Sequence, residues 1–454
     1  MKTMKRKVSI ETFGCRYNRL ESAEIAYELE KEGYAPVING DSPDVVVINT
    51  CTVTGRSDAK CRAAIRRAKL ANPQALVVVA GCYPETNPDE VAMVKGADIV
   101  VGNAGKHKIA QALGRLNGAG ADKAGRGDTA PTGDMLVRPI TRMEGRTNAY
   151  LNIQTGCDEA CSFCVVRLAR GKSRSARPQE VIAQVNRLAR AGIKEVALSG
   201  INVGEFGKGK DEGLARLIEG ILGATKIERI RLSSINPNNV TDELINVMAR
   251  SSRFCRHLHI PLQSGSDTVL ERMRRPYTRK EYEELLARLT GRIPDIGIGA
   301  DVMVGFPGET DEEFNETLEM IESSPVMMLH VFAYSPRENT LAFDYPHPVT
   351  KDKRKRRAMI LKELSAKLSR KMRERFTGKT LNVLIENERD REGYLKGFTD
   401  NYLPVKLQGS DATLNRIVPV KMISSNDSRL VGAPLEGSST PVINKEQSPG
   451  GSLE

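Results

Sequence analysis

The sequence predicts an α/β protein built from three folded segments, and two patterns predict this class. Short apolar runs alternate with helical patterns over residues 6–115 and again over residues 148–335. Such alternation is typical of parallel strands joined by helices. Residues 379–433 instead hold short alternating strands, which predict a small antiparallel β-barrel.

We expect the segments to fold around separate cores because 454 residues are enough for two or three of them. The first is a parallel sheet of the flavodoxin- or Rossmann-like kind, the second a partial (β/α)6 barrel, and the third the small β-barrel. Their expected boundaries are 5–115, 143–376 and 377–434. A Gly-, Ala- and Asp-rich linker at 116–142 and a disordered tail at 435–454 complete the chain.

Cysteines follow three of the strands expected in the first segment. Cys15, Cys51 and Cys82 each come just after an apolar run, and the carboxyl ends of parallel strands share one edge of a sheet. The three thiols are therefore expected to meet and to ligate a metal cluster. Three unrelated buried cysteines are the alternative. Cys61 and Cys255 are expected to be packing residues.

The second segment contains six strand-like runs separated by helical patterns. The runs are 149–153, 195–199, 229–235, 257–262, 298–304 and 328–334. Six such units predict a partial (β/α)6 barrel, whose chemistry lies at the carboxyl ends of its strands.

The loop after the first of these strands reads GCDEACSFC and contains Cys157, Cys161 and Cys164. Three thiolates at this spacing can hold three irons of a cubane cluster, which leaves the fourth iron for a small molecule. A zinc knuckle and a chance group of buried thiols are the alternatives. Zinc normally takes a fourth Cys or His nearby, and His107 and His257 are far away in the sequence.

This loop resembles that of the radical SAM superfamily, in which S-adenosylmethionine occupies the fourth iron. The stretches ETFGCRYNRLESAEI, VINTCTVT and VAGCYPE resemble the N-terminal domain of the methylthiotransferases, a radical SAM branch with two 4Fe–4S clusters. The resemblance continues through the rest of the chain. It implies that Cys157, Cys161 and Cys164 hold the catalytic cluster, that the other three cysteines hold the second, and that S-adenosylmethionine is both radical source and methyl donor.

The same resemblance implies which residues contact S-adenosylmethionine. They lie at strand ends of the barrel and are Phe163, Ser199, Gly200, Gly305 and Glu309. Plain turn chemistry is the alternative for the glycines. The chain departs from the family at two places near the cluster loop: Arg167 stands where Pro is usual, and Ala176 where Arg is usual.

Residues 351–376 hold 12 Lys or Arg against 3 Asp or Glu and have an apolar residue every four positions, from Ile360 to Phe376. This pattern predicts an amphipathic helix, which faces RNA, lies on a membrane surface, or packs on the barrel with its charges in solvent. The following β-segment resembles the TRAM domain, an RNA-binding module, in GYLKGFTDNYLPV. The candidate RNA contacts of the two regions are Lys353, Arg354, Lys355, Arg356, Arg357, Tyr394, Lys396, Phe398 and Tyr402.

The net charge of +11 favours a polyanionic partner, although a solvated surface explains a modest excess nearly as well. No apolar run reaches the length of a signal peptide or a membrane span, so we expect a cytoplasmic protein with no membrane partner, whose cysteines bind metal rather than form disulfides.

The resemblance implies the reaction as well. The stretches GCRYNRLES, RFCRHLHIPLQSGSD and LHVFAYSPREN are most similar to the branch that adds a methylthio group to carbon 2 of threonylcarbamoyladenosine, next to the tRNA anticodon. That carbon bears no acidic proton, so its substitution needs a radical. The expected partners are the tRNA anticodon stem-loop, a sulfur donor and a flavodoxin- or ferredoxin-like electron donor. The alternatives are isopentenyladenosine in tRNA, a ribosomal protein side chain, or a non-catalytic iron–sulfur RNA-binding regulator.

Overall fold

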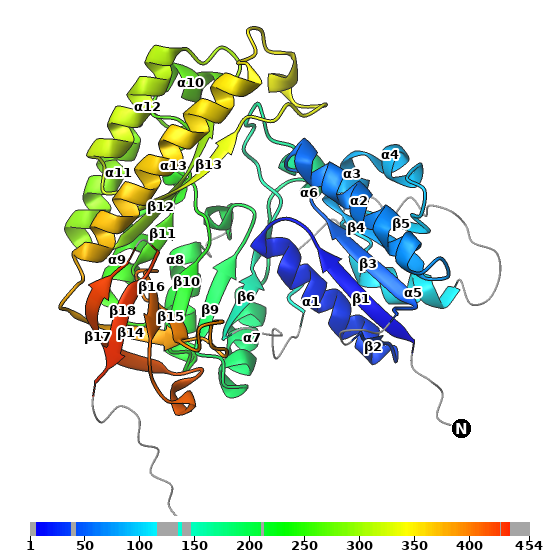
Figure 1. Ribbon diagram of the computed structural model, residues 1–454, viewed down its shortest axis with the longest axis horizontal. Helices are drawn as coiled ribbons and strands as arrows, with labels where there is room; N and C mark the ends of the chain where they lie inside the picture. The colour runs from blue at the N-terminus through cyan, green and yellow to red at the C-terminus, as the bar shows by residue number, and fades with distance from the viewer. Residues whose placement is uncertain are drawn as a thin grey trace, which may run out of the picture. The chain divides into compact units, whose positions relative to one another are not determined.

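The computed structural model describes residues 6–37, 42–115, 135–138, 147–209, 213–426 and 428–435 (Figure 1). Most of the expected linker and all but the first residue of the expected tail lie outside these ranges. The chain divides into two compact units, Met1–Ser369 and Arg370–Glu454.

The N-terminal part of the first unit is a five-stranded parallel sheet in the order β2-β1-β3-β4-β5. Its strands are β1 Lys7–Thr12, β2 Ala35–Pro36, β3 Val45–Thr50, β4 Leu76–Gly81 and β5 Ile99–Val101. Its helices are α1 Arg16–Lys31, α2 Gly55–Ala71, α3 Cys82–Thr86, α4 Pro88–Ala92 and α5 Ile109–Arg115.

The central strands of this sheet are buried on both faces. Val46 and Ile48 of β3 join an apolar cluster on one face, whereas Val45 and Val47 join a second cluster on the other. A parallel sheet covered by helices on both sides needs such continuous apolar strands, which is why VVVI appears without alternation.

The barrel consists of two three-stranded parallel sheets, β10-β9-β6 and β11-β12-β13. Single bridges, Ile230 to Phe254 and Ser234 to His259, join the end of one sheet to the other. Its strands are β6 Asn148–Asn152, β9 Glu195–Ser199, β10 Arg229–Leu232, β11 His257–His259, β12 Gly297–Val304 and β13 Met328–Ala333. The expected partial (β/α)6 barrel is therefore confirmed.

Helices follow the strands of the barrel and bury its apolar face. They are α7 Pro178–Arg190, α8 Leu214–Ala224, α9 Asp242–Arg250, α11 Arg279–Arg292, α12 Asp311–Ser323 and α13 Lys351–Glu374. Shorter elements are α6 Val166–Arg170, α10 Asp267–Arg272 and the hairpin of β7 Gln154–Thr155 with β8 Arg174–Ser175. Capping boxes at Thr278 and Thr310 begin α11 and α12.

The strands of the barrel sort their side chains by alternation. Residues such as Val196, Ile230 and Leu258 join the core with the helices. Because successive side chains point to opposite faces of a strand, their neighbours at 195, 229, 231, 257 and 259 face the interior of the barrel. That interior is strongly polar.

Helix α13 packs on the barrel core through Ala358 and Leu361, helped by the half-buried Leu364 and Leu368. Ile360, which the sequence pattern placed on the buried stripe, is 38% exposed. The prediction was wrong there because a helix has 3.6 residues per turn, so the buried face advances by three and four residues alternately rather than by four each time. None of the described helices is long and apolar enough to cross a membrane.

The second unit contains a closed five-stranded barrel in the order β14-β15-β16-β18-β17. Its strands are β14 Thr380–Ile385, β15 Leu395–Thr399, β16 Pro404–Leu407, β17 Ile417–Ser425 and β18 Leu430–Pro434. The expected small β-barrel is confirmed, with one refinement. β16 and β18 pair in parallel, because β17 first crosses to pair with β14 and the turn into β18 then restores the direction of β16.

Candidate functional site

The structure brings Cys157, Cys161 and Cys164, called here the barrel triplet, onto one loop after β7. The loop begins with Gly156 at φ +74°, where a Cβ would come within 2.0 Å of the Lys172 carbonyl oxygen. A residue other than glycine would therefore displace this backbone. Further along, the amide of Ser162 donates to the Met273 carbonyl at 3.1 Å and fixes the middle of the loop.

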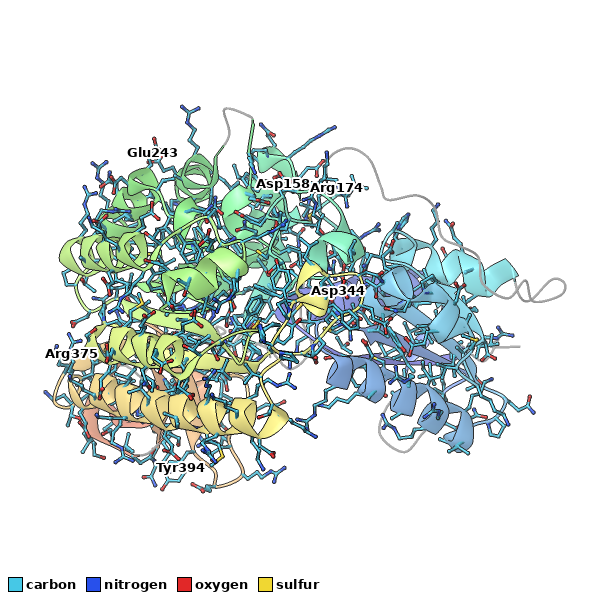
Figure 2. All side chains as sticks on the ribbon, turned by 90° about the horizontal axis from the view of Figure 1, so that it is seen from above. Asp158, Arg174, Glu243, Asp344, Arg375 and Tyr394 are labelled. Atoms are coloured by element: carbon cyan, nitrogen blue, oxygen red, sulfur yellow. The ribbon has the colours of Figure 1, made fainter. Side chains whose placement is uncertain are left out.

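The start of the loop is held by a carboxylate. Asp158 accepts a hydrogen bond from the amide of Ser173 at 3.0 Å and pairs with Lys208 at 3.3 Å. Figure 2 shows Asp158 beside Arg174, which belongs to the short hairpin strand β8. The hairpin and the cysteine loop are therefore held against each other by Asp158.

The electrostatics of the barrel triplet favour a bound cation. Burial, followed by the charges of Glu205, Cys161 and Cys164, raises the pKa of Cys157 to about 12. Burial and the charge of Cys161 likewise raise the pKa of Cys164 to about 11. Cys157 and Cys164 therefore resist ionisation in the bare protein but would ionise readily on a metal centre, because its positive charge offsets both causes. The donor set therefore fits an iron–sulfur cluster.

Arg275 adds a cation to this loop. Its Nη1 donates to the Cys161 sulfur at 3.0 Å, its Nη2 to Asn236 at 3.0 Å and its Nε to the Tyr277 hydroxyl at 3.0 Å. The sequence analysis missed Arg275, because MRRPYTR is one basic stretch among many.

The structure also gathers Cys15, Cys51 and Cys82, called here the sheet triplet, at the carboxyl edge of the N-terminal sheet. A Cβ on Gly14, beside Cys15, would come within 2.5 Å of the Cys51 Cβ. Burial raises the pKa of Cys51 to about 11, with added contributions from the charges of Cys82 and Cys15. This donor set also fits a cationic cluster. Cys61 is buried in α2 and directs its sulfur to the Cys51 carbonyl at 3.8 Å.

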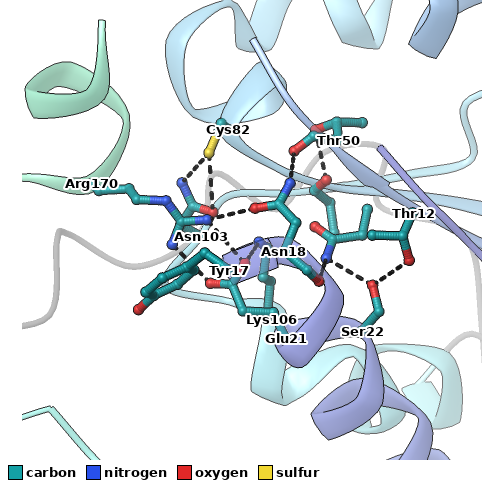
Figure 3. A network of polar contacts seen from close by, with 12 residues as sticks. Thr12, Tyr17, Asn18, Glu21, Ser22, Thr50, Cys82, Asn103, Lys106 and Arg170 are labelled. Atoms are coloured by element: carbon teal, nitrogen blue, oxygen red, sulfur yellow. Dashed lines mark hydrogen bonds and ion pairs between the residues drawn. The ribbon is translucent and has the colours of Figure 1, made fainter. Parts of the chain in front are cut away.

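A network of polar side chains joins the two halves of the site (Figure 3). Arg170, at the end of α6, donates to both oxygens of Glu21 at 2.9 and 3.0 Å and to Asn18 at 2.9 Å. Asn103 donates to the Ala169 carbonyl at 2.6 Å and lies 3.6 Å from the Cys82 sulfur.

Burial disfavours the charge of Arg170, but the charges of Cys82 and Glu21 outweigh it and raise the pKa of the guanidinium well above its usual range. Arg170 therefore stays cationic between the barrel loop and the sheet triplet. The sequence analysis missed Arg170 and Asn103, because neither belongs to a local motif.

A second contact joins the same edges. Arg337, in the loop after β13, forms an ion pair with Asp58 at 2.6 Å and donates to the Thr52 hydroxyl at 2.7 Å. Thr52 follows Cys51 directly. The strand ends of the sheet and the strand ends of the barrel therefore face each other.

The residues expected to contact S-adenosylmethionine lie in different settings. Ser199 is the last residue of β9, and Gly200 follows it with Gln154 close enough to exclude a Cβ. Gly305 has φ +70°, and its amide donates to the buried carboxylate of Glu309 at 2.6 Å. Phe163 packs edge-on against Phe306, with the ring centroids 6.4 Å apart.

Glu309 also pairs with Arg357, which in turn bonds Asp311 at 2.8 Å. Both Glu309 and Arg357 are buried, so they shape the turn at Gly305 and attach α13 to it. Arg357 thus presents no charge to solvent. Among the neighbouring cations, Lys353 pairs with Asp311 and Arg354 bonds the Tyr334 carbonyl, whereas Lys355 and Arg356 are exposed.

In the second unit, Phe398 and Tyr402 stack on each other with ring centroids 5.0 Å apart. The ammonium of Lys406 lies 4.5 Å above the ring of Tyr394, and Lys396 pairs with Glu386 at 3.4 Å. None of the three aromatic residues is fully buried, so their rings are accessible in part.

The two departures from the family pattern differ in their setting. Arg167 is exposed on α6. Ala176 is 3% exposed and belongs to the barrel core, so an arginine side chain would not fit there without displacing its neighbours.

Residues 151–321 match the radical SAM superfamily, and residues 7–102 match the uncharacterized protein family UPF0004. The threonylcarbamoyladenosine tRNA methylthiotransferase MtaB of Bacillus subtilis is 37% identical over 425 residues, which are 92% of this chain and 94% of that protein. The chain belongs to the radical SAM methylthiotransferase family. The tRNA-2-methylthio-N(6)-dimethylallyladenosine synthase of Caldicellulosiruptor saccharolyticus is 34% identical over 433 residues, 93% of this chain and 91% of that protein.

Among solved structures, the radical S-adenosylmethionine methyltransferase TsrM from Kitasatospora setae shares the fold of this methylthiotransferase. It has a TM-score of 0.54 and 18% identity, and the match covers 75% of this chain and 74% of TsrM. Membership of the family implies 4Fe–4S clusters and S-adenosylmethionine as the cofactors of the methylthiotransferase, in agreement with its two cysteine triplets.

Proposed function

We propose that this methylthiotransferase adds a methylthio group to carbon 2 of threonylcarbamoyladenosine next to the anticodon of tRNA. Three relatives named for that activity, from Bacillus subtilis, Aquifex aeolicus and Thermotoga maritima, are 35–37% identical to the chain. The observation that carries the proposal is the pair of cysteine triplets on facing strand ends, since the transfer of a sulfur-containing group needs one centre for the radical and another for the sulfur.

The barrel triplet would hold the cluster that works with S-adenosylmethionine, and the sheet triplet would hold the cluster that supplies sulfur. When bound, these groups supply a carbon-centred radical and an activated methylthio group. Ser199, Gly200 and Gly305 form the strand ends beside which S-adenosylmethionine would lie, and Phe163 supports the turn at Phe306. Arg275 holds one ligand of the barrel cluster by a charge-assisted hydrogen bond.

The chain's own residues set the geometry between the two centres. Arg170 and Arg337 attach the cysteine loops of the sheet to those of the barrel. Without these contacts the substrate base would have no fixed position between radical and sulfur, and misplacement by an ångström is enough to slow a reaction about a hundredfold.

For tRNA binding we propose two surfaces. One contains Lys355 and Arg356 on α13, and the other contains Tyr394, Phe398 and Tyr402 on the small β-barrel. Cations would neutralise phosphates and aromatic rings would stack on unpaired bases. We propose that the protein acts on tRNA in the cytoplasm. Its further partners would be a sulfur donor and a flavodoxin- or ferredoxin-like reductant.

Mass spectrometry of tRNA nucleosides tests the proposal. The anaerobically reconstituted protein is incubated with tRNA containing threonylcarbamoyladenosine, S-adenosylmethionine, sulfide and a reductant. A methylthio product is expected from the wild type and from Cys61→Ala, the matched control in the same domain, but not from Cys51→Ala. If the wild type modifies dimethylallyladenosine instead, the substrate is wrong. If it forms no 5′-deoxyadenosine, the reaction class is wrong.

A further inference from the structure

Three polar residues on neighbouring strands form a cluster inside the barrel. His259 of β11 lies with its Nε2 2.8 Å from Asp301 Oδ1, and His330 of β13 lies with its Nδ1 3.4 Å from the same oxygen of β12. The two imidazole rings stack with centroids 4.7 Å apart. We call these residues the His-Asp-His cluster.

The three residues of the cluster are held together by hydrogen bonds and charge. Burial disfavours the Asp301 carboxylate, but hydrogen bonds and charge from His259 and His330 outweigh it and hold its pKa below the usual range. The side chain of His259 is buried, that of Asp301 is partly covered, and that of His330 is 48% exposed. A carboxylate thus orients an accessible imidazole.

A short series of contacts connects the cluster to the barrel triplet. His259 forms a bridge with Ser234, and Asn236 and Pro261 each lie two residues further along the chain, beyond the ends of β10 and β11. Asn236 bonds Arg275, and Tyr277 bonds the Pro261 carbonyl at 3.0 Å. Because Arg275 also bonds Cys161, Asn236 lies only two residues from the bridge at Ser234 and shares its guanidinium partner with the barrel triplet.

The surroundings suit an anionic aromatic ligand. Arg229 and Arg231, also inside the barrel, pair with Glu195 at 3.9 and 3.0 Å. Burial and then the charge of Arg231 lower the pKa of His257 well below the usual range, so the deeper imidazole stays neutral. On β13, Phe332 shares the face of His330 and is 48% exposed, so part of its ring is accessible to a base.

We propose that the His-Asp-His cluster binds the free carboxylate of the threonylcarbamoyl substituent, while Phe332 stacks on its adenine. With Nδ1–H of His330 donated to Asp301, Nε2 is the accessible edge of the ring. A proton there gives a cation whose charge Asp301 balances, and it donates a charge-assisted hydrogen bond to the ligand carboxylate. An apolar dimethylallyl group would cover the Nε2 edge of His330 without giving it a hydrogen-bond partner, which costs free energy.

This inference rests on the proposed function and names the group that determines its substrate. A divalent metal ion is the competing occupant, since two imidazoles and a carboxylate can also ligate one. The exposed aromatic ring beside His330 favours the nucleoside, because stacking offers nothing to a bare ion.

The test uses two anticodon stem-loops that differ in one group: threonylcarbamoyladenosine and its threoninamide analogue, in which the carboxylate is replaced by a neutral amide. A hydrogen bond to a charged group contributes about 1.5–3 kcal/mol, so the wild type should prefer the carboxylate about 10–100-fold. The preference is measured as kcat/KM for methylthiolation and, without turnover, as the ratio of dissociation constants of the full-length apo-protein.

His330→Gln should abolish this preference, mostly through KM, while its iron content stays that of the wild type. His347→Asn, which removes an exposed imidazole from a surface loop, should keep the full preference. An equal response of the wild type to both stem-loops would overturn the inference, and so would a preference that survives in His330→Gln. Stoichiometric zinc or manganese bound by the wild type and lost in His330→Gln would assign the cluster to a metal instead.

The two proposals fail in different ways. A wild type that methylthiolates neither stem-loop contradicts the proposed function, yet the ratio of dissociation constants still tests the cluster. A wild type that modifies both equally well supports the function and refutes the role of His330.

Discussion

The ion pairs of Glu21 give a quantitative test of how the two halves of the site are held together. Glu21 lies between Arg170 and Lys106, with 14% of its side chain exposed and 4% and 7% of theirs. Burial raises the pKa of Glu21, but the charges of Arg170 and Lys106 outweigh it and lower the pKa from 4.5 to about 2. At 1.36 kcal/mol per pH unit, this difference of about 2.5 is worth about 3 kcal/mol of folding free energy.

The sign of the pH dependence follows from the lowered pKa. The unfolded chain binds a proton at Glu21 near pH 4.5, whereas the folded protein binds it only near pH 2. The stabilisation by Glu21 is therefore complete above pH 4.5 and disappears as the pH falls through about 2.

Glu21→Gln should lower the free energy of opening of α1 by about 3–5 kcal/mol, because it leaves two buried cations without their carboxylate. Arg170→Met should cost less, since Glu21 keeps Lys106. Glu28→Gln is the matched control on the same helix; Glu28 is partly exposed and pairs with Lys31 at 3.4 Å and with Arg138 at 3.9 Å, so its loss should cost about 1 kcal/mol or less.

Hydrogen exchange of the α1 amides in the apo-protein measures these free energies directly. The difference between wild type and Glu21→Gln should shrink as the pH falls below 4.5. A loss under 1 kcal/mol at pH 7, or a loss that is the same at pH 7 and pH 3.5, would refute the assignment of this stabilisation to the buried ion pairs.

Three further predictions follow from the site. Replacing the barrel triplet by alanine should leave about half of the roughly eight irons expected from two cubane clusters, and full retention of iron would contradict the assignment. Cys82→Ala should abolish methylthiolation but leave 5′-deoxyadenosine formation measurable, because radical generation needs only the barrel triplet. Removing residues 378–454, or changing Lys355 and Arg356 to Gln, should weaken tRNA binding and flatten its salt dependence. For 6–10 phosphate contacts, this dependence amounts to about 10³–10⁵ in affinity between 50 and 200 mM salt. A filter-binding titration that either change leaves unaltered would exclude the surface that the change removes.

Much of the fold was predictable because its signals are local. The residues of β9, Glu195–Ser199, were expected with the observed bounds. The sheet triplet was predictable because each of its thiols follows its own strand and strand topology brings the ends together. The barrel triplet was predictable because its three thiols lie on one short loop. The role of α13 was less predictable. The sequence shows 12 cations over residues 351–376, but only the structure shows that Arg357 is buried against Glu309.

The residues that the sequence analysis missed act between elements. Arg170 and Glu21 are 149 positions apart, and no spacing rule relates them. The His-Asp-His cluster takes one residue from each of three strands, so its members are far apart in the sequence as well.

A weaker signal for the cluster was nevertheless present. Helices cover the outer face of the barrel, so polar residues that alternate with apolar ones along its strands must face inward, as in RIRL of β10, HLH of β11 and LHVF of β13. A barrel interior without a ligand is normally filled by branched apolar side chains, and polar groups there cost free energy unless they are paired. Polar alternation in the strands of such a barrel is therefore itself a sign of a binding site, and it points to the residues that face the ligand.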